Sequence, residues 1–418
     1  MKKLLIITGA GASIEFGMPT VRIIDEWFDN WAKEALPLAS DPNDSLYAWM
    51  KRQEKEYCKS NPNNWHDKIL NFENLLYTLQ LLGELEKDRR WKHFNNRLNP
   101  FISLEPFPNL IRYGKEKSAD GDDFHYLHAH LVDELLSKLR QQCASLPADK
   151  PNEIIALRDF LTALRRDFEI GVLNLNYDNV VLTALPDLQT GFNSTTGSFD
   201  RSQIYGPKWN FCFHLHGSVH FDMKGGKDTE MHKIVWNNDL RLPFTSNAGG
   251  RSGNFSGEGT MHLNSNIIAG LDKANQVLMR EPFAEYYMQI GRLIYEADAI
   301  LFMGYGFSDW HLNRLFPFIR YDQNKRRKVV ILDWASDTQG GLHFRHDPWS
   351  MAVFQTVPFN GREMGSGGKS FVEPNPAIHY KRRKSFEKSC NPEYPLAVWY
   401  NGLLEATKYP ERFIEQLY

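Results

Sequence analysis

The sequence predicts an α/β fold, a Rossmann-like doubly wound parallel sheet with a mainly helical insertion. Short apolar runs that stop at glycine or polar residues recur at 4–8, 171–175, 209–213, 299–303, 329–332 and 352–357. Helical patterns separate several of these runs, as at residues 153–166 and 281–296. Alternation of strand and helix favours a parallel sheet covered on both faces, because each crossover lays a helix on the sheet.

Residues 34–150 lack strand-like runs. Apolar residues recur there at spacings typical of helices, as in residues 71–82 and 124–139. We therefore predict a helical insertion over 34–150, placed inside a discontinuous sheet domain of residues 1–33 and 151–360. Glycine-rich stretches at 245–259 and 361–368 predict loops, and residues 361–418 form a C-terminal extension.

Composition narrows the class of protein. The 418 residues include 49 basic and 51 acidic side chains, so a surface-wide affinity for nucleic acid or anionic membranes is not expected. The basic runs at 325–328 and 381–384 leave open docking to an acidic partner, so nucleic acid is expected only indirectly. No apolar stretch reaches the roughly 20 residues that span a bilayer. Four scattered cysteines without a Cys-x-x-Cys pair predict a cytoplasmic protein with no metal site of zinc-ribbon spacing.

The first strand runs directly into a small-residue turn. Gly9, Ala10 and Gly11 follow it, with Ser13 and Gly17 close behind. Small residues where a strand meets a helix let a pyrophosphate approach the backbone, and N–H groups at the helix start face it. The usual dinucleotide fingerprint would have a third glycine where Ile14 stands. This motif alone leaves open both a phosphate site and a bare strand–helix turn.

Polar residues also follow the later predicted strands. Asn176-Tyr177-Asp178, Leu215-His216-Gly217, Gly304-Tyr305-Gly306-Phe307-Ser308-Asp309 and Asp333 each come at or near the end of a strand. The carboxyl ends of parallel strands share one edge of a sheet, so these residues should lie near one another. A histidine there titrates near neutral pH and can take a proton. The alternatives are purely structural roles, as a core histidine for His216 and as a loop or capping carboxylate for Asp333.

Four of these motifs resemble those of sirtuins and come in the same order, over residues 4 to 335. They are the turn after the first strand and the segments at 176–178, 215–217 and 304–309. The opening Gly-Ala-Gly-x-Ser-x-x-x-Gly-x-Pro, followed by Arg22, is similar to the first sirtuin motif. The resemblance implies that Asn176 positions ribose and water, that Asp178 holds the nicotinamide carboxamide and that His216 is the catalytic base. It implies NAD binding by Gly9, Ala10, Gly11, Ser13, Gly17, Arg22, Gly304, Gly306, Ser308 and Asp333.

The departures from sirtuin deacylases are informative. The chain cannot build their Cys₄ zinc module, and Val21 stands where they carry an aromatic residue. With its helical insertion, the chain resembles the SIR2-like proteins of bacterial antiphage defence, which hydrolyse NAD⁺. That resemblance implies NAD as substrate, no zinc, a homo-oligomer and a regulatory partner such as a HerA-like ATPase. A non-catalytic subunit that senses NAD or ADP-ribose remains an alternative, and NAD-dependent protein deacylation is a weaker one.

Overall fold

The structure is a computed structural model. It describes residues 1–60, 70–91, 107–112, 114–206, 208–224, 233–247, 254–255, 261–262, 265–270, 273–278, 281–316, 327–342, 345, 347–357, 377–389 and 395–418. The predicted loop at 361–368 and most of the one at 245–259 lie outside these residues. Within them, no helix is both long enough and apolar enough to cross a membrane.

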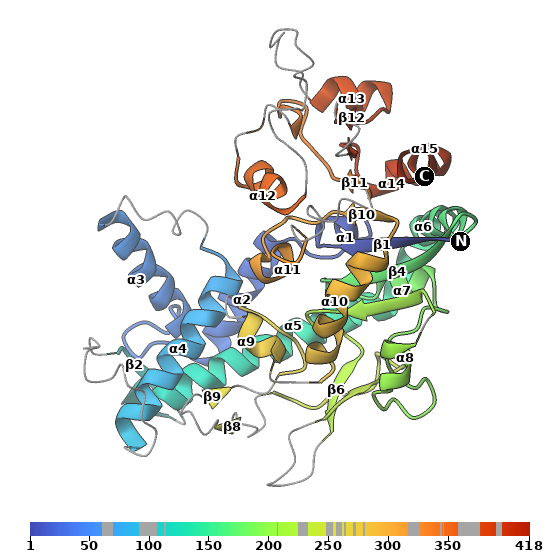
Figure 1. Ribbon diagram of the computed structural model, residues 1–418. Helices are drawn as coiled ribbons and strands as arrows, with labels where there is room; N and C mark the ends of the chain where they lie inside the picture. Colours follow the sequence, from blue (N-terminus) through green and yellow to red (C-terminus); the bar gives the residue numbers. More distant parts are fainter. Residues whose placement is uncertain are drawn as a thin grey trace.

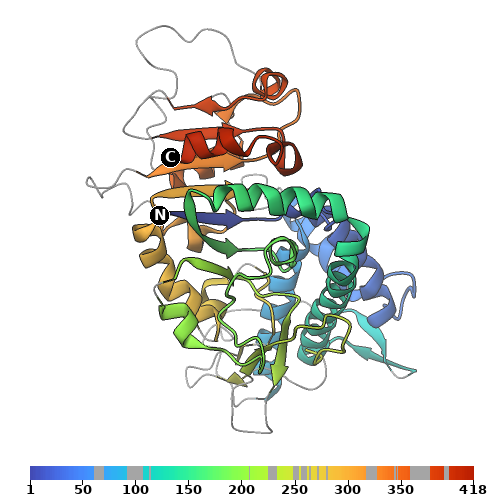
Figure 2. The same cartoon turned by 90° about the vertical axis from the view of Figure 1, so that its right-hand side faces the viewer.

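A mostly parallel seven-stranded sheet forms the centre of the fold. Its order is β12 (Glu387–Lys388), β13 (Leu396–Trp399), β11 (Lys328–Leu332), β10 (Ala299–Met303), β1 (Lys2–Thr8), β4 (Phe168–Asn174) and β5 (Asn210–His214). All neighbours pair in parallel except β12, which runs antiparallel to β13. In Figure 2 these strands lie one above another, from red and orange through the dark blue β1 to green. The predicted α/β class is confirmed.

Both faces of this sheet are buried. Alternate residues of β1 enter different apolar clusters, with Leu4 and Ile6 in one and Leu5 and Ile7 in the other. Helices α6 (Pro151–Leu164) and α15 (Pro410–Leu417) contribute to the first cluster. Helices α10 (Phe283–Glu296) and α12 (Pro348–Thr356) contribute to the second. Because helices cover both faces of the sheet, the sequence of β1 contains a continuous apolar run and not an alternating pattern.

The insertion is a helical bundle beside the sheet. Helices α2 (Val21–Ala35), α3 (Leu46–Ser60), α4 (Phe72–Trp91) and α5 (Gly121–Asp149) pack on one another, and α5 also reaches α6. Figure 1 shows α3 and α4 to one side of the sheet. A capping box between Asp120 and Asp123 begins α5. The helices predicted within 34–150 are present as α3, α4 and α5, whereas most of α2 precedes the predicted insertion. The prediction missed the hairpin of β2 (Asn109–Arg112) and β3 (Lys115–Ser118).

Short elements complete the described chain. They are α1 (Gly11–Ile14), α7 (Val180–Ala184), α8 (Arg201–Tyr205), β6 (Phe221–Lys224), β7 (Lys233–Trp236), β8 (Asn254–Phe255), β9 (Met261–His262), α9 (Lys273–Leu278), α11 (Trp310–Asn313), α13 (Ala377–Arg383) and α14 (Leu403–Ala406). The first and last described residues lie close together in both views (Figures 1 and 2). Lys2 Nζ donates to the backbone oxygen of Tyr418 at 2.6 Å.

Two of the predictions made from the sequence differ from the structure. Of the run at 352–357, which we predicted as a strand, all but the last residue belongs to the C-terminal part of α12. Asp347 caps this helix by accepting from the Ser350 N–H at 2.9 Å, and Pro348 fits its first turn, so local capping decides the conformation. Residues 361–418, which we set apart as an extension, supply β12 and β13 to the main sheet.

The turns after β1 and β10 meet at backbone distance. Gly304 has a φ of +56°, and a Cβ on it would lie 2.0 Å from the Ala12 nitrogen. A Cβ on Gly9 or Gly11 would lie 2.8 Å or 2.9 Å from the Gly304 oxygen. Glycine is therefore needed on both sides of this contact.

We expect Gly304→Ala to lower the free energy of unfolding by about 3 kcal/mol or more, through the positive φ and the clash with Ala12. Denaturant unfolding followed by circular dichroism measures this. The matched control is Gly306→Ala in the same turn, where a Cβ would meet nothing within 4 Å. A control as damaging as Gly304→Ala would contradict the proposed contact.

Candidate functional site

The predicted site residues come from the carboxyl ends of adjacent parallel strands. Asn176 and Asp178 follow β4, His216 follows β5, and the glycine turns follow β1 and β10. These four strands are neighbours in the sheet. The arrangement is the one that makes ligand crevices in open α/β sheets.

Most backbone N–H groups in the turn after β1 are hydrogen-bonded within the protein. The N–H groups of Gly9 and Gly11 donate to the carbonyls of Met303 and Gly304, at 3.0 Å and 2.9 Å, and those of Ala12 and Ser13 donate within the turn. Most of the amides expected to face a pyrophosphate are thus already bonded. The backbone of the turn is nevertheless open, since Ala10 and Gly11 are exposed. Across from it Gly306 and Ser308 are exposed too.

Asn176 joins the ends of β4 and β1. Its Nδ2 donates to the Gly9 carbonyl at 2.9 Å and to the Ser13 hydroxyl at 3.0 Å. The Ser13 side chain in turn hydrogen-bonds Asp178. Asp178 also accepts from the Val180 N–H at 3.0 Å, and its burial raises the pKa of the carboxyl. The structure therefore gives Asp178 a supporting place beneath Asn176 and Ser13.

A second polar layer below these residues was not predicted. Thr8 donates to the Asn174 side-chain oxygen at 2.7 Å, and that same oxygen accepts from the Asn176 N–H at 3.0 Å. The Asn174 amide nitrogen lies 3.3 Å from His214 Nδ1. Burial lowers the pKa of His214 to about 3, so its ring is neutral. These side chains hold the ends of β1, β4 and β5 together.

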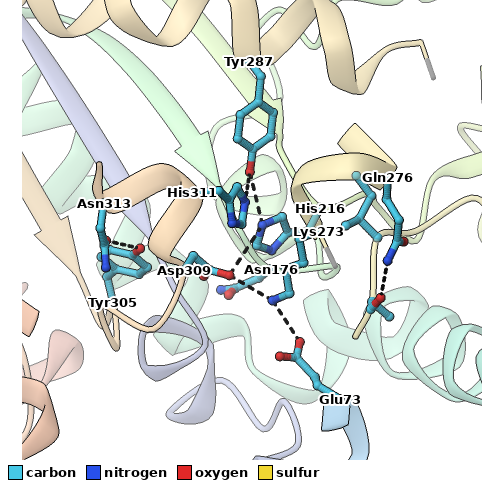
Figure 3. A network of polar contacts seen from close by, with 12 residues as sticks. Glu73, Asn176, His216, Lys273, Gln276, Tyr287, Tyr305, Asp309, His311 and Asn313 are labelled. Atoms are coloured by element: carbon cyan, nitrogen blue, oxygen red, sulfur yellow. Dashed lines mark hydrogen bonds and ion pairs between the residues drawn. The ribbon is translucent and has the colours of Figure 1, made fainter. Parts of the chain in front are cut away.

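His216 lies in a buried polar network (Figure 3). Its Nε2 is 3.3 Å from the Tyr287 hydroxyl and 3.8 Å from Asp309 Oδ1. The Tyr287 hydroxyl is also 2.8 Å from His311 Nε2. A hydroxyl has one proton, so it donates to one imidazole and accepts from the other. Tyr287 thereby connects His216 to the less buried His311.

Burial decides the protonation state of His216. It lowers the pKa of the imidazole to about 3, although the nearby Asp309 carboxylate acts in the opposite direction. Lys273 and His311 lower this pKa further. At neutral pH the ring is therefore uncharged and can accept a proton.

A chain of ion pairs continues from Asp309 (Figure 3). Lys273 Nζ donates to Asp309 Oδ1 at 2.9 Å and lies 3.1 Å from Glu73 Oε1. Burial alone would raise the pKa of Asp309, but Lys273 and His216 outweigh it and hold that pKa well below its usual value. Burial would lower the pKa of Lys273, but Glu73 and Asp309 raise it. Both groups are therefore charged.

The same cluster offers metal-type atoms. One ligand atom each from His216, Asp309 and His311 lie within 4.8 Å of one another. The Lys273 ammonium, 2.9 Å from Asp309 Oδ1, already supplies the cation there. The cluster therefore fits an ion pair better than a metal.

Two predicted residues lie apart from this centre. Arg22 is on α2 with its side chain 81% exposed, and it pairs with Glu26 one turn along the helix. Asp333 follows β11, and its backbone pairs with Trp399 and Gly402. Burial raises the pKa of Asp333 to about 6. Gly17 adopts a positive φ of 88° in the turn that follows α1.

A separate cavity of about 550 Å³ lies along the β5 edge of the sheet. Asn179 and His220 line it, together with Trp236, which stacks on His220 at 4.4 Å. None of the predicted site residues lines this cavity. It is therefore distinct from the cluster around His216.

Sequence reasoning missed Glu73, Lys273, Tyr287 and His311, and it quoted Asp309 without giving it a role. Glu73 and Lys273 are far from the motifs in sequence. The only sequence signals were the segment Asn-Phe-Glu-Asn-Leu-Leu around Glu73 and the Ser-Asp pair that ends the glycine turn. Tyr287 lies inside an amphipathic helix, where an aromatic residue is expected to belong to the hydrophobic core.

Comparisons with known proteins found remote solved structures and one matching family model. No curated protein matches the sequence. Among solved structures, two mutants of a Sir2 homologue bound to ADP-ribose each align at 13% identity and TM-score 0.32, covering 86% of this chain and 87% of theirs. A Sir2 homologue mutant bound to 2′-O-acetyl ADP-ribose aligns at 15% identity and TM-score 0.29, covering 80% and 81%.

These structural likenesses are remote, so the fold assignment rests on the sheet of this chain. The family comparison is more direct. Residues 171–346 match the family model of the SIR2-like domain. That span holds Asn176, Asp178, His216 and Asp309. Over these residues the chain is therefore similar to SIR2-like domains.

Proposed function

We propose that the chain hydrolyses NAD⁺ at the nicotinamide–ribose bond. The observation that carries the proposal is the neutral imidazole of His216, buried next to the Asp309 carboxylate at the end of β5. Asn176, which closes the neighbouring strand, provides an amide for positioning. A SIR2-like domain over these residues supports NAD as the ligand.

The reaction needs a positioned ribose, a nucleophile and balanced charge. Water adds to C1′, nicotinamide leaves with the bonding electrons, and one proton is released. His216 accepts that proton at Nε2, where Asp309 stabilises the imidazolium. Tyr287 and His311 give the proton a path outward. The products are nicotinamide and ADP-ribose in equal amounts.

Asn176 connects the ribose subsite to the glycine turn. Its two amide N–H groups are used by Gly9 and Ser13, which leaves its side-chain oxygen as the group to accept from water or a ribose hydroxyl. We assign the diphosphate to the exposed backbone of Ala10 and Gly11 and to the facing turn at Gly306 and Ser308. Asp333, at the end of β11, is assigned to the adenosine half.

The intact His216 network favours turnover over the alternative of a sensor without catalysis. Deacylation is disfavoured because the cysteines lack zinc-module spacing. The resemblance further supports an antiphage effector that depletes NAD⁺ in the cytoplasm. An enzyme of this kind is harmful when always on, so we extend the proposal to a homo-oligomer controlled by a partner such as a HerA-like ATPase.

His216→Gln should lower kcat for nicotinamide release by about 10²–10⁴-fold, because it removes the proton acceptor. Asn176→Ala should lower it similarly, since it also frees the glycine turn. Nicotinamide is measured by chromatography, with circular dichroism to confirm folding. The matched control is His220→Gln, another buried histidine close by in the sequence, which should stay near wild type. Near wild-type turnover in His216→Gln would refute the assignment of the base.

Nicotinamide and ADP-ribose should form in a one-to-one ratio without any peptide, because water is the nucleophile. A zinc chelator should leave the rate unchanged, since no cysteine pair has ligand spacing. Both products are quantified in one assay with and without an acyl-lysine peptide. Strict dependence on the peptide, or loss of activity that zinc restores, would establish a deacylase instead.

The acid side of the pH profile should be flat. Burial lowers the pKa of His216, so the neutral base persists as the pH falls, whereas an exposed histidine is lost below about pH 6.5. We expect kcat/KM to stay constant from pH 8 down to about pH 5. A decline centred near pH 6.5 would show that the essential base is not buried as His216 is.

A further inference from the structure

A side chain of the helical insertion, Glu73, connects to the residues around His216. Glu73 lies in the first turn of α4, and its carboxylate is 3.1 Å from the Lys273 ammonium. Lys273 is buried and donates to Asp309, which in turn faces His216. An ion-pair chain therefore runs from the insertion through α9 to Asp309, in the turn after β10, and Asp309 lies beside His216 (Figure 3).

The position of Glu73 is fixed by the start of its helix. The side-chain oxygen of Asn71 accepts from the N–H groups of Glu73 and Asn74, at 3.0 Å and 3.2 Å. Asp25 on α2 accepts from the Phe72 N–H at 2.5 Å. The Phe72 ring packs edge-on against Phe28 of α2 at 5.4 Å. The carboxylate is thus presented by a capped and packed helix end.

The count of charges shows what Glu73 contributes. Asp309 and Glu73 are each negative and Lys273 is positive, so the chain carries one net negative charge. Without Glu73 the Lys273 ammonium would cancel Asp309, and the base would face no net charge. A buried negative charge stabilises both a protonated base and a cationic transition state.

We propose that Glu73 is a positioning residue that neutralises Lys273, so that Asp309 remains free to stabilise positive charge at His216 and at the reacting ribose. The inference rests on the proposed NAD⁺ cleavage. It makes the docked insertion part of the active site, since activity requires α4 in place.

Four other charged or titratable groups of the described residues surround His216. Asp309 faces it from the turn after β10, Lys273 from α9, Tyr287 from α10 and His311 from α11. Tyr177, beside Lys273 and Asp309, is uncharged because burial raises its pKa. Among these groups, only Asp309 is negative.

Four variants test the charge count. Glu73→Gln brings the net charge to zero, Lys273→Met brings it to two negative charges, and the double variant restores one. Lys51→Met is the control, because it breaks an ion pair of 2.7 Å between α3 and Asp29 of α2 outside this network. The full-length protein is used throughout, with NAD⁺ as substrate.

Glu73→Gln should lower kcat about tenfold with KM changed less than about twofold. The double variant should recover kcat to within about threefold of wild type, and Lys51→Met should match wild type. Lys273→Met should move the acid limb of kcat/KM to higher pH. A structural role alone predicts that the double variant is at least as impaired as Glu73→Gln, and that result would overturn the proposal.

A second readout needs no turnover. NMR titration of the His216 ring, identified by the signal lost in His216→Gln, should give a higher pKa in Lys273→Met than in wild type or the double variant. Equal values in all three would overturn the charge argument. If wild type fails to cleave NAD⁺, the proposed function is refuted, and this titration still decides whether Glu73 and Lys273 set the charge at His216.

Discussion

The contact between the glycine turns after β1 and β10 determines the geometry of the site. Gly9 and Gly11 donate across it to Met303 and Gly304, at a separation that no side chain would permit. Asn176 reaches back to the Gly9 carbonyl from one side. On the other side, the turn that begins at Gly304 continues to Asp309. The glycines therefore act first as a joint between two strand ends, and the exposed backbone available to a ligand follows from that joint.

Burial and charge oppose each other around this joint. Burial lowers the pKa of His216, whereas Asp309 raises it. The result is a neutral imidazole with a carboxylate at 3.8 Å, which would stabilise a proton added to the ring. Lys273 would defeat this arrangement, and Glu73 offsets Lys273. The polar residues of the site thus work as a set whose net charge matters more than any one pair.

The sequence allowed the sheet and its polar edge to be predicted because both depend on local signals. Buried parallel strands such as β1 and β10 are short apolar runs, and the residues that end them lie together by topology. The networks could not be predicted, because Glu73, Lys273 and Asp309 meet only through tertiary packing. The helix α12 was mistaken for a strand because its capping by Asp347 outweighs an ambiguous apolar run. The strand β13 was missed because prolines interrupt the sequence just before its four residues.

The residues of the ion-pair chain lie far apart in the sequence, and this has a consequence for the order in which the site forms during synthesis. Glu73 leaves the ribosome first, and the insertion helices α2 to α5 can pack on one another before the later strands exist. Lys273 and Asp309 arrive much later, and β13 must still pair with β11 after them. The charge at His216 is therefore assembled only after these later segments have been synthesised. Under the proposed function, the nascent chain does not consume NAD⁺ until this charge is in place.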